Sequence, residues 1–156
     1  ANPDAFNPDF AMSLNNLAIL LSDLGRRSEA LGPAQEAVEL YRALARANPD
    51  AFNPDLAMSL GMMGQVQEAN GNLDAALACF REGIEVLTPA FGQLPEAFAP
   101  LVRALALHYL RTLKALSREP DYGGAEAFLV PAIETFLRVP NAGPFPAPPT
   151  TPGPSP

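Results

Sequence analysis

The side chains best suited to catalysis are one cysteine, Cys79, and one histidine, His108, because a thiolate beside an imidazole is a common nucleophile–base pair. They are 29 residues apart and fall on different predicted helices, so Cys79 is interpreted as a small helix-packing residue. The run Gly61–Gly64 lies within a predicted helix and lacks the lysine and hydroxyl of a phosphate-binding loop. Since no nucleophile is paired with a base, we predict no enzyme activity, cofactor or metal.

A second candidate site is a set of cations that we call the basic ridge, consisting of Arg103, Arg111, Lys114 and Arg118. With Leu107 in the first gap, its steps are 3 or 4 residues, so the side chains are expected to share one helical face beside His108. Such a ridge can hold an acidic peptide or a terminal carboxylate through charge-assisted hydrogen bonds. The alternatives are a contact with an acidic neighbouring molecule and a solvated basic face, where each ion pair contributes little.

The charge balance limits the kinds of partner. The 156 residues carry a formal net charge of −7, and the single cysteine allows no internal disulfide. An acidic protein lacks the basic surface that nucleic acid requires, so we predict no nucleic-acid partner. No apolar run is long enough to cross a bilayer, so we predict no membrane insertion.

The elements that position these side chains come from an internal repeat. Residues 1–14 read ANPDAFNPDFAMSL and residues 47–60 read ANPDAFNPDLAMSL, a shift of 46 residues with one difference. A third, weaker copy, QLPEAFAPLV, begins at Gln93. The chain therefore divides into a repeat domain at 1–139, with units at about 1–46, 47–92 and 93–139, and a proline-rich tail at 140–156.

Each unit is predicted to form two helices. In unit one Asn7 is placed to cap, Pro8 suits the first helical position and Asp9 suits the first turn. An apolar stripe then follows, at Leu14, Leu17, Ala18, Leu21 and Leu24. Gly25 ends this helix, and the second helix runs from about residue 28 to 46, with Gly32-Pro33 expected to delay its start or kink it. We predict that Leu17→Asp unfolds unit one by burying a carboxylate.

Units two and three repeat this plan, with a break at Asn70-Gly71 and a longer third turn at residues 117–124. A last helix is predicted at about 125–138, with Pro131 inside it. Alanine and leucine dominate, and β-branched residues are sparse. The sequence therefore predicts an all-α helical-repeat solenoid of three helix–turn–helix units with an irregular proline-rich C-terminal tail.

The small and apolar positions of these units resemble the tetratricopeptide repeat family over about residues 8–139. Unit one supplies Leu17, Ala18, Leu21, Gly25, Ala30, Ala34 and Ala37, and unit two supplies Met63, Gly64, Gln67, Gly71, Ala76, Phe80 and Gly83. The period of 46 residues exceeds the family's usual length of about 34. This departure is similar to the longer repeats of kinesin-light-chain-like bacterial proteins.

The resemblance implies a concave groove lined by the first helix of each unit, where a peptide or partner surface binds. The positions expected in this groove are Asn15, Asn16, Ile19, Asp23, Met62, Gln65, His108, Arg111 and Lys114, with Met12, Ser22, Met58, Glu68, Ala104 and Ala115 around them. The carboxamides can pair with the backbone of an extended peptide, and the methionines supply an adaptable apolar floor. The alternative is that these amides are solvated helix residues.

Two functions follow from this organisation. The first is a non-catalytic protein–protein interaction scaffold, part of a larger repeat array. The alternative is a subunit that stacks on copies of itself, head to tail, into a filament or ring, because a solenoid buries each unit on the next. The compartment is unknown: cytoplasmic for a fragment of a regulatory repeat protein, extracellular for a fibre subunit.

The proline-rich tail at 140–156 is too rich in proline to form a helix and should be extended. We interpret the tail as a linker, and two other roles are open. The run Pro144–Pro146 could dock on a neighbouring molecule, and Thr150, Thr151 and Ser155 suit O-glycosylation if the protein is exported.

Overall fold

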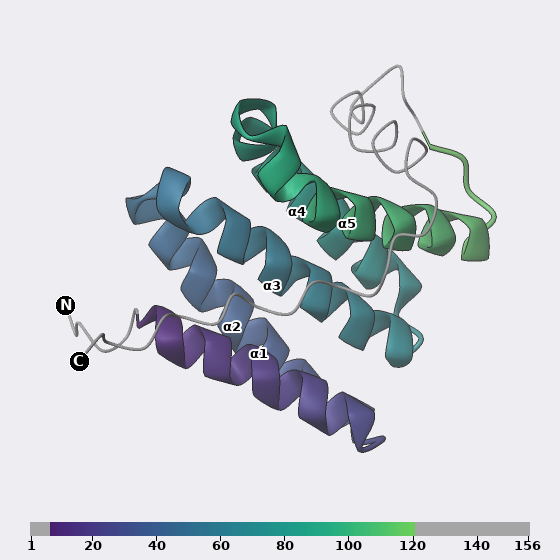
Figure 1. Cartoon of the computed structure of the whole chain (residues 1–156). Helices are drawn as coiled ribbons and strands as arrows, with labels where there is room; N and C mark the ends of the chain where they lie inside the picture. Colours follow the sequence, from purple (N-terminus) through teal and green to yellow (C-terminus); the bar gives the residue numbers. More distant parts are fainter. Residues whose placement is uncertain (1–6, 121–156) are drawn as a thin grey trace.

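The computed structural model describes residues 7–120, and this part of the chain is an all-α solenoid (Figure 1). Its helices are α1 (Pro8–Asp23), α2 (Arg27–Ala47), α3 (Pro49–Ala69), α4 (Leu73–Gln93) and α5 (Pro95–Ala115). The pairs α1–α2 and α3–α4 are complete helix–turn–helix units, and α5 is the first helix of a third. The last helix predicted at about 125–138, Pro131 within it and the tail at 140–156 lie outside the described residues.

Asparagine and proline start the first helices of units one and two. The side chain of Asn7 accepts a hydrogen bond from the Asp9 amide at 2.8 Å, as predicted, and Pro8 occupies the first position of α1. Asn48 caps α3 in the same way, accepting from the Ala51 amide at 3.3 Å. Proline suits this position because its missing N–H would have no partner within the helix. Asn48 is also the single residue between α2, which ends at Ala47, and α3, which begins at Pro49.

Four prolines lie inside helices: Pro33 in α2, Pro54 in α3, Pro89 in α4 and Pro100 in α5. Pro33 is in the second turn of α2, which begins at Arg27. Of the two effects predicted for Gly32-Pro33, a delayed helix start or a kink, the delayed start was therefore wrong. Pro54, one repeat after Pro8, likewise falls inside α3, which begins five residues earlier at Pro49. Proline this close to a helix start costs one backbone hydrogen bond, which the packing of the rest of the helix outweighs.

Each first helix ends in the same left-handed turn. The residues with positive φ are Gly25 at 76°, Gly71 at 78° and Ser117 at 53°, and they are one 46-residue repeat apart. In every case the next amide bonds a carbonyl five residues back: Arg26 to Leu21 at 2.8 Å, Asn72 to Gln67 at 2.9 Å and Arg118 to Leu113 at 3.0 Å. Glycine adopts this conformation freely, whereas Ser117 adopts it at a cost.

The core fills the space between consecutive helices, because each helix packs against the one before and the one after it. Small residues set the closest approaches. A Cβ added at Gly64 would lie only 2.4 Å from the Phe80 ring, so α3 and α4 meet with no room for a side chain there. Gly64 and Gly83, two of the small positions that the repeat pattern identified, are therefore contact points between helices.

The apolar stripe predicted for α1 is only partly buried. Leu14 and Ala18 are buried, as predicted, but Leu17 is 44% exposed and Leu24 is 71% exposed. The prediction that Leu17→Asp buries a carboxylate was therefore wrong. The equivalent residue one repeat later, Met63, is 9% exposed, because α2 packs on that side of α3. The equivalent side of α1 has no preceding helix among residues 7–120.

The first helices lie on the inner side of the solenoid. Helix α1 contacts α3 and α3 contacts α5 directly, in addition to the contacts of each with its neighbours along the chain. Figure 1 shows α1, α3 and α5 following one another through the molecule. The free faces of these three helices form the surface on which the resemblance places the groove.

Candidate functional site

Groove residues from two units meet between α1 and α3. Ile19 and Asp23 of α1 line a cleft of about 80 Å³ with Met62 and Gln65 of α3, and Ser22 and Val66 complete it. Ile19 and Gln65 are half-buried and Asp23 is exposed, so the cleft combines apolar walls with an amide and a carboxylate at its rim. Four residues predicted from separate repeats thus border one surface depression.

The two asparagines predicted for the groove differ in burial. Asn16 is exposed. Asn15 is 4% exposed and its Oδ1 accepts a hydrogen bond from the Ser59 hydroxyl at 3.1 Å, joining α1 to α3. A buried amide held in this way stabilises the contact between units. The expectation that Asn15 presents its carboxamide to a ligand was therefore wrong.

His108 belongs to a polar cluster where α3 meets α5. Its Nδ1 lies 3.0 Å from Oε2 of Glu68, and the Thr112 hydroxyl donates to Oε1 of Glu68 at 2.7 Å. Phe80 of α4 stacks on the imidazole, with ring centroids 5.0 Å apart. Burial alone would raise the pKa of Glu68, but hydrogen bonds from His108 and Thr112 and the charges of His108 and Arg111 outweigh it and lower that pKa. His108 therefore links helices on the groove side.

The basic ridge is not one uniform helical face. Arg111 and Lys114 are exposed on α5, whereas Arg103, two turns into that helix, is half-buried. Arg118 lies beyond the end of α5, after the left-handed turn at Ser117, and its Nη1 is 3.2 Å from Oδ1 of Asp74 on α4. The prediction that Arg118 shares the face was wrong, because the turn redirects the chain. Arg111 and Lys114 are the ridge residues that are exposed on α5 itself.

The polar contacts between units were not predicted, although the repeat gives a signal for them. Their sequence separations are all 40 to 44 residues, slightly less than one repeat: Asn15–Ser59, Arg27–Asn70, Arg42–Glu82, Glu68–His108, Glu68–Thr112 and Asp74–Arg118. Complementary polar residues at this separation face one another because successive units stack nearly in register. A search for such pairs would have found Thr112 as the partner of Glu68.

Cys79 lies on α4, half-buried and packed against the core, as interpreted from the sequence. Burial, with the charge of Glu82, raises the pKa of its thiol to about 11 despite the opposing charge of Arg42. A thiol with this pKa stays protonated at neutral pH and is a poor nucleophile. Among residues 7–120, no cluster of three or more histidine, cysteine, aspartate or glutamate side chains is arranged to hold a metal ion.

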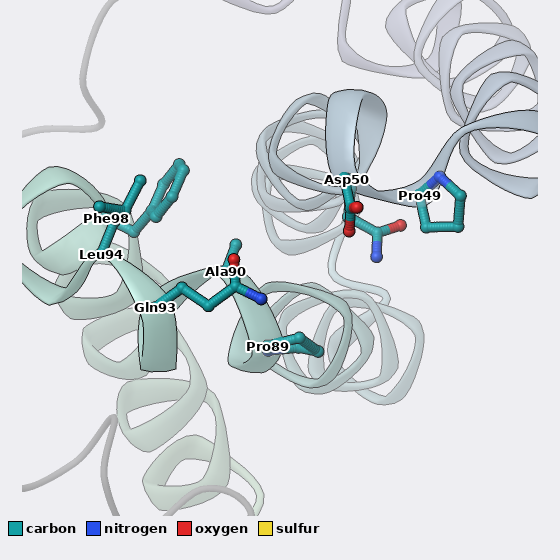
Figure 2. A pocket seen from close by; sticks show the side chains of 8 residues that line it. Pro49, Asp50, Pro89, Ala90, Gln93, Leu94 and Phe98 are labelled. Carbon is teal, nitrogen blue, oxygen red and sulfur yellow. The ribbon is translucent and has the colours of Figure 1, made fainter.

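A second depression lies at the junction of units two and three. Figure 2 shows it between the start of α3 and the end of α4, with Leu94 and Phe98 on one side and Asp50 across from them. Its volume is about 110 Å³, and the remaining lining residues are Pro49, Asn53, Pro89, Ala90 and Gln93. We call this depression the junction pocket. Asp50 is the one titratable residue in its lining, and the pocket is a shallow contact surface.

The stacked helix–turn–helix units define the class of this protein as an all-α helical-repeat solenoid. Residues 10–50 match the family model described as tetratricopeptide repeat, which supports membership of this family. The match covers α1, α2 and the start of α3. Neither the curated proteins nor the solved structures include a match to this chain.

Tetratricopeptide repeats generally mediate protein–protein interactions and typically act as non-catalytic scaffolds, so the family points to protein partners. Within the part of the chain that the structure describes, no helix has the length and apolar character needed to cross a membrane.

Proposed function

We propose that this protein is a non-catalytic scaffold that binds an extended peptide, or an extended segment of a partner, along the groove formed by α1, α3 and α5. The observation that carries the proposal is the cleft between α1 and α3, where Ile19, Asp23, Met62 and Gln65 converge from two units. Its apolar walls suit a bulky peptide side chain. The Gln65 carboxamide can both donate to and accept from a peptide backbone.

The charges along the groove suggest an orientation for the peptide. Asp23 is exposed at the α1 end, whereas Arg111 and Lys114 are exposed on α5 at the other end. Glu68, between them, is already hydrogen-bonded to His108 and Thr112. A peptide with an apolar residue in the α1–α3 cleft and acidic residues, or its terminal carboxylate, toward α5 matches this arrangement.

The test is selection of a displayed random peptide library on the purified protein, followed by calorimetry with the enriched peptides. We expect peptides with an apolar residue followed by acidic residues. Gln65→Ala should weaken their binding about fivefold, the effect of losing one hydrogen bond of ~1 kcal/mol. The matched control is Gln35→Ala, an exposed glutamine on α2 outside the groove. No enrichment, or equal losses in both variants, would contradict the proposal.

The 46-residue period supports a finer assignment within the family, to the longer repeats of the kinesin-light-chain-like bacterial type. The extra length is helical, because α3 and α5 each begin about five residues before their second proline, Pro54 or Pro100. The head-to-tail filament has weaker support. It needs a complementary surface in unit three, whose second half lies outside the described residues.

A further inference from the structure

The junction pocket contains three polar side chains whose hydrogen-bonding groups are unused within the described part of the chain. Asp50 and Asn53 lie near the start of α3, and Gln93 is the last residue of α4. Among residues 7–120, these side chains make no hydrogen bond or ion pair. Figure 2 shows Asp50 on one side of the pocket, with the Gln93 side chain extending between it and Leu94. The three groups are therefore available to a bound molecule.

The charges around the pocket favour a cation. The last carbonyl groups of a helix lack donors within it and form the negative end of its dipole, so they attract positive charge. Helix α2 has Arg46 in its last turn, whereas α4 has no basic residue there, and Gly92 holds the equivalent place one repeat later. The starts of α3 and α5 also lie at the pocket, and their first turns carry the acids Asp50 and Glu96. A cation from outside the pocket complements these charges.

The size and the walls of the pocket indicate which cation fits. An apolar cavity of about 150 Å³ holds benzene, with six heavy atoms, so a volume of about 110 Å³ has room for about four. A guanidinium group, one carbon and three nitrogens, has this size. The walls include Pro89, Leu94 and Phe98, and Leu94 is 59% exposed. Such walls suit the apolar stem and flat face of arginine better than the strongly hydrated ammonium of lysine.

We propose that the junction pocket binds an arginine side chain of a partner protein. The guanidinium donates to the Asp50 carboxylate, and its remaining N–H groups donate to the carboxamide oxygens of Asn53 and Gln93. The arginine stem lies against Leu94 and Phe98. The formal net charge of −7 draws a basic partner toward the protein. The pocket shares no lining residue with the cleft between α1 and α3, so this contact is additional to peptide binding in the groove.

Titration of the full chain with three short peptides tests the chemistry. The probes are acetylated tripeptide amides with arginine, lysine or citrulline between two glycines, followed by ¹H–¹⁵N correlation spectra at low salt. The arginine peptide should bind with a Kd on the order of 1 mM and shift amide signals within residues 50–53 and 90–98. The lysine peptide should bind about fivefold more weakly, and citrulline, the neutral isostere of arginine, should not bind. Equal binding of either peptide, or shifts confined to the groove residues, would overturn the proposal.

A matched pair of variants tests the site. Asp50→Asn should weaken binding of the arginine peptide about fivefold, the effect of one ion pair at a partly open site. Glu36→Gln, which removes an exposed carboxylate on α2 outside the pocket, should leave the affinity unchanged. Because both side chains are exposed, both variants should keep the wild-type pattern of signals away from the substituted residue. Unchanged affinity in Asp50→Asn, or equal losses in the two variants, would overturn the proposal.

Light scattering distinguishes a separate partner from a second copy of this chain. With a separate partner as the occupant, Asp50→Asn and wild type should have the same mass at every protein concentration. A wild-type mass that rises above 16.5 kDa with concentration, and that Asp50→Asn returns to this value, would mean that an arginine of another copy fills the pocket. That result would overturn the assignment to a separate partner.

Discussion

At the scale of single residues, burial depends on which unit a residue occupies. Leu17 and Met63 hold the same place in the repeat, yet one is 44% exposed and the other 9%. We predict that Met63→Asp lowers the free energy of unfolding by at least ~3 kcal/mol, because it buries an unpaired carboxylate. Leu17→Asp should change it by only about 0.5 kcal/mol, as expected for an exposed site.

Urea unfolding of both variants at a dilute protein concentration measures the two effects. Equal destabilisation would mean that α1 is covered in solution. The comparison uses one substitution at two equivalent positions, so it separates the effect of the neighbouring unit from that of the residue type.

Ser117 holds a conformation that the other two units give to glycine. Its φ of 53° is in the left-handed region, which costs a residue with a Cβ about 1–2 kcal/mol. We predict that Ser117→Gly raises the free energy of unfolding by about 0.5–1 kcal/mol, after the greater chain entropy of glycine is subtracted. The complementary change, Gly71→Ser, should destabilise by a similar amount. The denaturant midpoint should therefore rise for Ser117→Gly and fall for Gly71→Ser. A shift of both midpoints in the same direction would mean that this turn is not formed.

At the scale of helices, a polar cluster connects α3 to α5. The pKa of Glu68 is lowered from its ordinary value of 4.5, so its stabilising contribution is complete above that value and is lost as the pH falls through the lower, folded-state pKa. We predict that wild type is more stable than Glu68→Gln at pH 6 and that the difference shrinks steadily below pH 4.5. Thermal melts of both proteins between pH 6 and 3 check this. A difference independent of pH would exclude a charged Glu68 as its source.

The helix ends were predictable because their determinants are local. Asn7 caps α1 and Gly25 ends it, as the sequence indicated. The path of α2 through Pro33 was not predictable from local preference. The penalty of one proline is fixed, whereas the packing that outweighs it depends on residues from other helices.

At the scale of the whole molecule, the exposed cations of α5 are predicted to set partner preference. Arg111→Glu with Lys114→Glu should weaken binding of acidic peptides at least tenfold and leave the helical content unchanged, because both side chains are exposed. Calorimetry and far-UV circular dichroism measure the two quantities. The control is Arg46→Glu, an exposed arginine at the end of α2. Unchanged affinity in the double variant would remove the basic ridge from the binding site.

The sequence by itself determined the repeat, the order of helices and turns, and most of the core. A 46-residue period and a 3.6-residue apolar spacing are properties of the chain alone. It also indicated Ile19, Asp23, Met62 and Gln65, which line one cleft. The repeat and the helix order were predictable because equivalent residues of a solenoid recur in equivalent surroundings, whereas partner binding by these four residues stays a prediction.

The tertiary structure alone decided which members of a repeated position are covered and which polar groups are already paired. Leu17 is exposed and Met63 buried, although both satisfy the same pattern, because within residues 7–120 only Met63 has a preceding helix, α2, packed on its side of the helix. Asn15 is bonded to Ser59, and Glu68 to His108 and Thr112, across distances of 40 to 44 residues in sequence. Burial and hydrogen bonding between units depend on how the helices stack, which local spacing does not specify.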